Sequence, residues 1–178
     1  MFKKIALGLV GLVVLLLVVV ALQPAAFHIE RSATIHAPAD QIYARIHDLK
    51  AQNEWSPWIR MDKDIKVTYS GPPNGVGAMS EWTGPQMGSG RLTVTDVKPN
   101  QEVGLKLEML APMAATNRVV FTLAPTGDAT TVTWAMDGEN NFIGKAFCLV
   151  FDQDEMIGGP FEQGLATLKS QSETRADG

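Results

Sequence analysis

The C-terminal segment from Asn141 to Glu173 is the sequence feature that most constrains how this chain can fold. Upstream of it, Phe27–Glu139 shows the short alternating patterns and frequent turn signals of β-strands. A sheet of such strands leaves one face in water, and only the C-terminal segment is long enough to supply a helix that covers it. Within this segment Phe161, Leu165 and Leu168 fall at i, i+4 and i+7, which is one stripe of a helix. We therefore expect a sheet wrapped around a C-terminal helix.

The same segment is predicted to contain two helical halves. Phe142–Phe151 is apolar on nearly every side, and a segment of that kind is normally buried in protein or faces a ligand. Proline suits the first turn of a helix, where its missing N–H leaves no bond unmade, but it interrupts a helix interior. The sequence Gly158-Gly159-Pro160 therefore predicts a kink or short break, with Pro160 in the first turn of the second half.

The N-terminus carries an uncharged run from Ile5 to Leu22, rich in Leu and Val, directly after Lys3-Lys4. A helix of this length rises roughly 27 Å, which is close to the thickness of a bilayer core. We expect residues 1–26 to be an uncleaved single-pass transmembrane anchor. The lysines would then be cytoplasmic, and the domain of residues 27–178 would lie on the extracytoplasmic (periplasmic) side. The alternative is a signal sequence cleaved near Pro24–Ala26, which would release a secreted domain.

Charge and composition exclude several classes of function. Lys and Arg number 15 against 19 Asp and Glu, and two of those cations precede the apolar run. This acidic balance argues against nucleic-acid partners, which are bound through basic patches. His28, His36 and His47 share no short ligand spacing, and Cys148 is the only cysteine. We therefore expect no metal, no cofactor and no internal disulfide.

Few ionisable residues are candidates for chemistry. Asp152, Asp154 and Glu155 form an acidic cluster, and one of them is a candidate general base with a raised pKa at the mouth of a pocket. The interpretation that we favour places them in and before the first turn of a helix, where the helix dipole stabilises carboxylates. Arg91 and Arg118 begin strands, and they either reach an acidic ligand group or lie in solvent at the rim.

The middle of the chain is predicted to be an antiparallel meander. A first strand, Phe27–His36, is followed by a helix that begins near Pro38. In Trp55–Trp58, we interpret the two indoles as a structural corner that pins this helical region to the sheet. Six further strands follow, with turn signals every ten residues or so, and short connections of that kind indicate antiparallel pairing. The fold class is α+β.

Several motifs along Phe27–Glu173 occur in a characteristic order. They are Ile35-His36-Ala37-Pro38, Trp55-Ser56-Pro57-Trp58, Gly75-Val76-Gly77 ahead of Trp82, Gly88-Ser89-Gly90 ahead of Pro99, Ile157-Gly158, Phe161-Glu162 and Gly164 to Lys169. In these motifs the chain resembles the START-like (SRPBCC) superfamily, in particular its polyketide cyclase/dehydrase and lipid-transport branch. The resemblance implies a helix-grip fold, in which a seven-stranded curved antiparallel sheet surrounds a long C-terminal helix with a cavity between them. Members bind lipids, sterols, polyketides and other apolar compounds there, and a few are enzymes.

The large apolar side chains favour such a cavity, because aromatic residues and methionines are numerous for one small domain. The candidate cavity residues are Trp82, Leu105, Leu107, Met109, Phe121, Trp134, Met136, Phe147, Phe151 and Phe161. The leading hypothesis is a membrane-tethered binding module that holds a small apolar ligand, lipid or polyketide-like. The alternatives are a cyclase/dehydratase-type enzyme that uses the same cavity and an interaction protein of the cell envelope. The strands place no carboxylate on their inward face, which counts against the enzyme.

Overall fold

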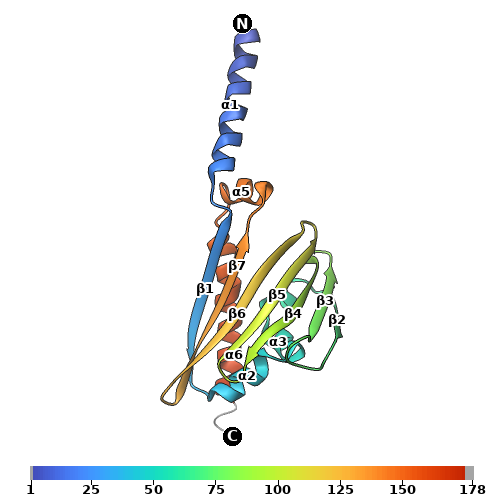
Figure 1. The fold of residues 1–178 in the computed structure, drawn as a ribbon, viewed down its shortest axis with the longest axis vertical. Helices are drawn as coiled ribbons and strands as arrows, with labels where there is room; N and C mark the ends of the chain where they lie inside the picture. Colours follow the sequence, from blue (N-terminus) through green and yellow to red (C-terminus); the bar gives the residue numbers. More distant parts are fainter. Residues whose placement is uncertain (1, 175–178) are drawn as a thin grey trace.

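A seven-stranded antiparallel sheet curves around a long C-terminal helix in the computed structural model, which describes residues 2–174 (Figure 1). The strands, in the order in which they lie in the sheet, are β1 (Ala26–Ile35), β7 (Ala129–Glu139), β6 (Ala115–Thr126), β5 (Glu102–Ala111), β4 (Gly88–Lys98), β3 (Met79–Gly84) and β2 (Lys66–Ser70). The helices are α1 (Phe2–Leu22), α2 (Ala39–Ile46), α3 (Leu49–Trp55), α4 (Pro57–Met61), α5 (Phe142–Cys148) and α6 (Gln153–Glu173). The predicted α+β helix-grip fold is confirmed.

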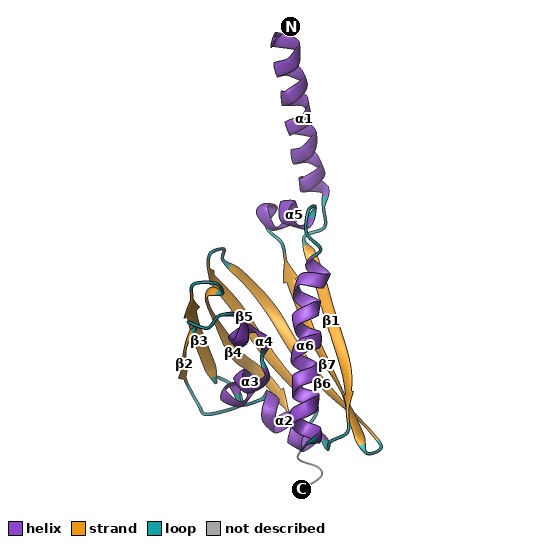
Figure 2. Ribbon diagram, turned by 180° about the vertical axis from the view of Figure 1, so that it is seen from behind, coloured by secondary structure: helices purple, strands orange, loops and turns teal. Residues whose placement is uncertain are grey.

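The connection from β1 to β2 explains why the first strand pairs with the last. After β1 the chain runs through α2, α3 and α4 across one face of the sheet and enters β2 at the opposite edge (Figure 2). The remaining strands return one by one, so that β7 ends beside β1 with Arg31 opposite Trp134. The helices begin where the sequence supplies caps: Asp48 accepts hydrogen bonds from two backbone N–H groups of α3, and Pro57 is the first residue of α4.

Helix α6 covers the concave face of the sheet, as the spacing of its apolar residues predicted. Phe161, Leu165 and Leu168 are all buried and join the main hydrophobic core, and α6 lies along β1 (Figure 2). Ile42 and Ile46 of α2 are buried in the same core. The core therefore lies between the sheet and the helices, and the convex face is left to solvent.

The break in the C-terminal segment lies earlier than predicted. α6 continues through Gly158-Gly159-Pro160, and Pro160 is the eighth residue of the helix rather than part of its first turn. The helix begins instead after Asp152, whose carboxylate accepts hydrogen bonds from the N–H groups of Asp154 and Glu155. Gly158 has a packing role, since a Cβ there would collide with the guanidinium of Arg31, which lies across α6. Gly158 therefore reflects close packing against β1 and not a chain break, whereas a Cβ at Gly159 would meet no neighbour.

Helix α1 projects away from the sheet at the end where β1 begins (Figure 1). Lys3–Leu22 is long and apolar enough to cross a membrane, a test that a signal sequence near the N-terminus also passes. From Ile5 to Leu22 its apolar side chains are exposed, with the exception of Val20, which is buried near the point where α1 meets α5.

Candidate functional site

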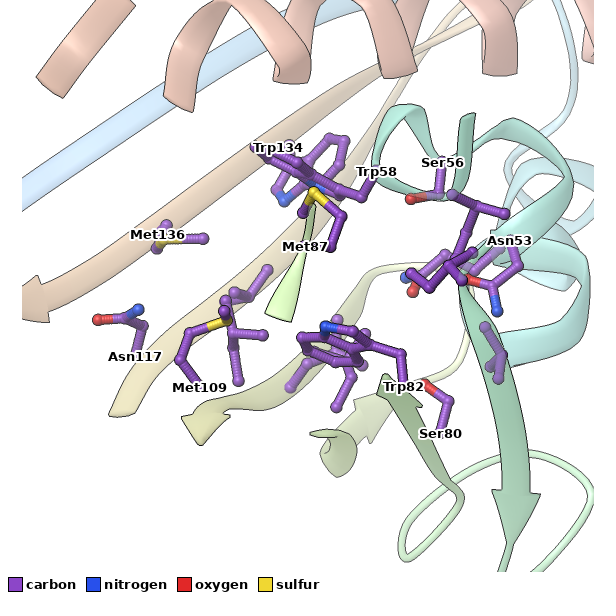
Figure 3. Close-up of a pocket in the computed structure, with 18 of the residues that line it drawn as sticks. Asn53, Ser56, Trp58, Ser80, Trp82, Met87, Met109, Asn117, Trp134 and Met136 are labelled. Atoms are coloured by element: carbon purple, nitrogen blue, oxygen red, sulfur yellow. The ribbon is translucent and has the colours of Figure 1, made fainter. Parts of the chain in front are cut away.

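A cavity of about 290 Å³ lies between the concave face of the sheet and helices α3 and α4, with α6 at one side (Figure 3). Strands β2 to β7 all contribute to its wall. Alternate residues of a strand point to the same face of a sheet, which is why Leu105, Leu107 and Met109 of β5 all reach it. On the helical side Gln52, Asn53, Ser56, Trp58 and Ile59 line it, with Ile157 from α6.

Most of the predicted cavity residues surround this space. They come from the middle strands, whose inward faces were recognisable from alternation, and they are Trp82, Leu105, Leu107, Met109, Phe121, Trp134 and Met136. Figure 3 shows Trp82 of β3, Met109 of β5, and Trp134 and Met136 of β7 facing the space. The sequence therefore indicated the strand walls of the cavity.

The three predicted residues from the C-terminal segment lie elsewhere. Phe161 is fully buried beneath the cavity wall, where its ring stacks on Trp134 with centroids 4.1 Å apart. Phe147 and Phe151 stack on each other, 4.3 Å between centroids, and both are exposed on and just after α5. The reason is the position of α5: it follows β7 past the end of the sheet, toward α1, instead of folding back over the concave face (Figure 1).

The cavity is also lined by residues that the sequence analysis did not predict. They are Gln52, Asn53, Ser56, Trp58, Ile59, Ile65, Val67, Ser80, Met87, Leu92, Asn117, Val119 and Ile157. Strand alternation would have found Val67, Leu92 and Val119, whereas the α3–α4 contribution depends on how the helices cross the sheet.

The two tryptophans of the predicted corner, Trp55 and Trp58, have different roles in the structure. Trp55 is fully buried and its indole N–H donates to the Arg45 carbonyl at 3.0 Å, but Trp58 lines the cavity.

Two hydrogen-bond donors in the cavity wall have no partner in residues 2–174. The indole Nε1 atoms of Trp82 and Trp134 are both buried, and their N–H groups donate to no acceptor among the described residues. Trp82 lies flat over Gly90 of the neighbouring strand, where any Cβ would collide with its ring. A buried N–H group without a partner is unfavourable. Both nitrogen atoms are closed to water as the rings stand, so an acceptor on a ligand would reach them only after the indole rings shift toward the cavity.

Asp62 holds one corner of the cavity in place. Its side chain is buried and its carboxylate accepts hydrogen bonds from the backbone N–H groups of Gln86 and Met87, at 2.8 and 3.0 Å, and of Asp64. These bonds, that of Met87 first, lower the pKa of Asp62 below its usual value. The carboxylate therefore fixes the β3–β4 turn, from which Met87 reaches the cavity.

Among the described residues that line the cavity, none has an ionisable side chain. The acidic cluster has a structural role: Asp152 caps α6, and Asp154 pairs with Arg31 at 2.6 Å. That hydrogen bond lowers the pKa of Asp154, which is the opposite of the shift a general base at a pocket mouth requires. Arg91 lies between the carboxylates of Glu81 and Glu108, and neither it nor Arg118 lines the cavity.

The curved sheet, the long C-terminal helix and the apolar cavity between them define a helix-grip protein. The chain belongs to the polyketide cyclase/dehydrase and lipid transport family, whose model matches residues 26–173. No curated protein matches the chain.

Solved structures share the fold at low sequence identity. A truncated norcoclaurine synthase from Thalictrum flavum is 14% identical with a TM-score of 0.64, over 84% of this chain and 95% of that chain. A protein from Nitrosospira multiformis is 17% identical with a TM-score of 0.61, over 85% of this chain and 100% of that chain. The di-domain aromatase/cyclase StfQ of the steffimycin pathway is 12% identical with a TM-score of 0.62, over 86% of this chain and 53% of that chain. At these identities the likeness is one of fold alone.

Proposed function

We propose that this protein is a membrane-tethered binding module that holds a small, uncharged apolar ligand with a hydrogen-bond acceptor. The observation that carries this proposal is the character of the cavity wall. It is apolar apart from a few amide and hydroxyl groups, and two buried indole N–H groups of Trp82 and Trp134 have no partner among the described residues. Ligand sites are typically apolar with a small number of polar groups that fix orientation.

Burial of apolar surface would supply the affinity. Each methylene group that moves from water into the cavity contributes about 0.8 kcal/mol, so a ligand with eight of them gains about 6 kcal/mol before the costs of association. The cavity of about 290 Å³ is at the small end of ligand pockets and corresponds to the liquid volume of about ten waters. A single ring system or one short chain suits this space, whereas a phospholipid with two acyl chains does not.

The polar groups narrow the chemical class of the ligand. The unpaired N–H groups require an oxygen acceptor, such as that of a ketone, an ester or a quinone. A carboxylate is disfavoured, because among the described lining residues no cation compensates for its desolvation. The side-chain amide of Asn117, which also lines the cavity, offers both a donor and an acceptor and is suited to a hydroxyl or carbonyl group on the same ligand.

The tether is α1. A span of this length with Lys3 and Lys4 at its start is expected to keep its N-terminus in the cytoplasm and the domain on the extracytoplasmic side. A protein held at a bilayer meets apolar molecules where they are concentrated. The enzyme alternative has less support, because acid–base catalysis needs a titratable group beside the substrate and the described cavity wall offers none.

The test is mass spectrometry of organic extracts from the full-length protein, purified from membranes with α1 intact. We compare the protein with Leu107→Trp, which places a large ring in the cavity, and with Lys106→Trp. Lys106 is the preceding residue of β5, and its side chain points to the opposite face of the sheet.

We expect an uncharged apolar compound in near-stoichiometric amount from the parent and from Lys106→Trp, and its loss from Leu107→Trp. Lipids bound around α1 or carried in detergent will be the same in all three proteins. An extract that does not change on filling the cavity contradicts the binding proposal.

A further inference from the structure

The segment after β7 exposes more large apolar side chains than any other part of the described domain outside α1. Phe142, Ile143, Phe147, Leu149, Val150 and Phe151 are all exposed, Ile143 by 62% and Val150 by 77%. Single exposed apolar residues are ordinary, but a contiguous patch of this kind marks a surface that meets something other than water. We call this patch, residues 142–151, the α5 surface.

The α5 surface does not serve the cavity. None of its residues lines the cavity, and its two aromatic rings at Phe147 and Phe151 stack on each other outside the sheet. Its function must therefore be sought on the outer side of the domain. There it carries a single charged residue, Lys145, between Glu139 and Asp152.

The position of the α5 surface identifies what it meets. α5 lies crosswise at the end of α1, between that helix and the sheet (Figures 1 and 2). The Lys145 ammonium donates to the carbonyl of Ala21, one residue before the end of α1, and Val20 is buried nearby. The Asn140 N–H donates to the carbonyl of Ala25 at 2.8 Å, which fixes the start of the segment beside the start of β1. The α5 surface therefore lies level with the last turn of the candidate membrane span.

A second exposed apolar region lies at the same end of the sheet. Leu110 and Met113, in and after β5, are each about half exposed. The β5–β6 connection is at this end because β6 runs antiparallel to β7, with Arg118 opposite Asp137 shortly before β7 ends. The end of the domain that faces α1 thus carries apolar residues from two separate connections.

We propose that the α5 surface is a bilayer-docking surface, in which residues 142–151 insert into the interfacial layer of the leaflet from which α1 emerges. This inference rests on the proposed tether. Apolar side chains that lie at the depth of the headgroups and upper acyl chains are removed from water, and a lysine there extends its ammonium to the polar layer. Docking would fix the domain upright on the membrane, with the cavity end that contains Met109, Asn117 and Met136 directed toward the lipid.

The test measures the membrane depth of single spin labels on the full-length chain in phosphatidylcholine vesicles. Cys148→Ser removes the native thiol and keeps a donor to Gln153, whose side-chain oxygen lies 3.2 Å from the sulfur. Labels are then placed by Val150→Cys on the α5 surface, by Leu12→Cys in α1 and by Val76→Cys. Val76 is the matched control, because it is an exposed valine, at 57%, in the β2–β3 connection at the other end of the sheet.

Accessibility to oxygen, which concentrates in lipid, is compared with accessibility to a water-soluble nickel complex. We expect the labels at positions 150 and 12 to favour oxygen and the label at position 76 to favour nickel. A label at position 150 that favours nickel, while the label at position 12 favours oxygen, overturns docking and leaves the tether intact.

Three other results would each lead to a different conclusion. If the label at position 12 also favours nickel, or if alkaline washing strips the chain from the vesicles, the tether itself is wrong. If the label at position 150 is protected from both reagents and shows dipolar broadening from a second label, another copy of the chain covers the α5 surface. Protection from both without broadening means that the domain itself covers it, and either result overturns docking.

Discussion

The two unpaired indole groups predict that one tryptophan can be changed so that ligand binding weakens while stability stays nearly the same. Trp82→Phe removes a buried N–H that bonds to no described residue, and the missing ring atoms border a cavity that already exists. No intramolecular hydrogen bond is lost, so the unfolding free energy of the ligand-free protein should change by less than about 1 kcal/mol. The ligand, however, loses the donor that Trp82 offers.

The expected loss in affinity follows from one hydrogen bond. A net contribution of about 0.5–1.5 kcal/mol corresponds to binding that is about 2- to 12-fold weaker. Trp55→Phe is the matched control, because the Trp55 N–H donates to the Arg45 carbonyl and the ring is fully enclosed. Losing that bond and leaving a void should cost about 2–4 kcal/mol of stability, or roughly 5–15 °C in Tm, with little direct effect on the ligand.

The assay is circular dichroism melting of the extracted, ligand-free proteins, followed by titration with the ligand identified in the extracts. The reasoning is refuted if Trp82→Phe lowers Tm as much as Trp55→Phe does, since its N–H would then already be satisfied. It is also refuted if Trp82→Phe binds the ligand with unchanged affinity. Trp134→Phe should lose affinity too, but with some loss of stability, because its ring stacks on Phe161 and contacts Trp55 and Phe121.

Three further predictions concern residues that pack around the cavity: Phe161, Gly90 and Asp62. Phe161→Ala should cost about 3–5 kcal/mol, measured by denaturant titration, because the ring is fully buried; a loss below 1 kcal/mol would mean that α6 is not packed as described. Gly90→Ala should displace the Trp82 ring and cost about 1–3 kcal/mol, with a shift in tryptophan emission, whereas an unaltered spectrum would contradict this packing. Because hydrogen bonds lower the pKa of Asp62, the stability it confers should be present above the unfolded pKa of about 3.9 and be lost as pH falls through the lower folded value. Hydrogen exchange at the Met87 amide should report that loss, and Asp62→Asn should abolish the pH dependence.

The sequence predicted the sheet and its inward faces well, because a strand signals its buried side by simple alternation. Leu105, Leu107 and Met109 alternate with Lys106 and a glutamate, and they line the cavity as that pattern implies. The apolar stripe of α6 was equally readable. These features depend on local periodicity, which the sequence carries directly.

The helical wall of the cavity was not predictable in the same way. Trp55 and Trp58 lie on either side of Ser56-Pro57, yet one ring is enclosed in the core and the other lines the cavity. The difference arises from the angle at which α3 and α4 cross the sheet, which is a tertiary property. Arg31 similarly interrupts the apolar face of β1, and only the structure explains it: the guanidinium pairs with Asp154 and Glu162 across the gap that Gly158 leaves.

Phe142–Phe151 does not line the cavity, where the sequence analysis placed two of its residues, although the physical rule behind that prediction is sound. A segment that is apolar on all sides must avoid water, and for a soluble domain the only dry place is its own interior. In this chain the segment lies beside the last turn of α1, so a second dry environment is available to it if α1 spans a bilayer. The concave face of the sheet is already covered by α6, whose stripe at Phe161, Leu165 and Leu168 joins the core, and by α2 to α4. If α1 spans a bilayer as proposed, that bilayer would account for both the exposure of α5 and the apolar length of α1, whereas a cleaved and secreted domain would leave the α5 surface in water.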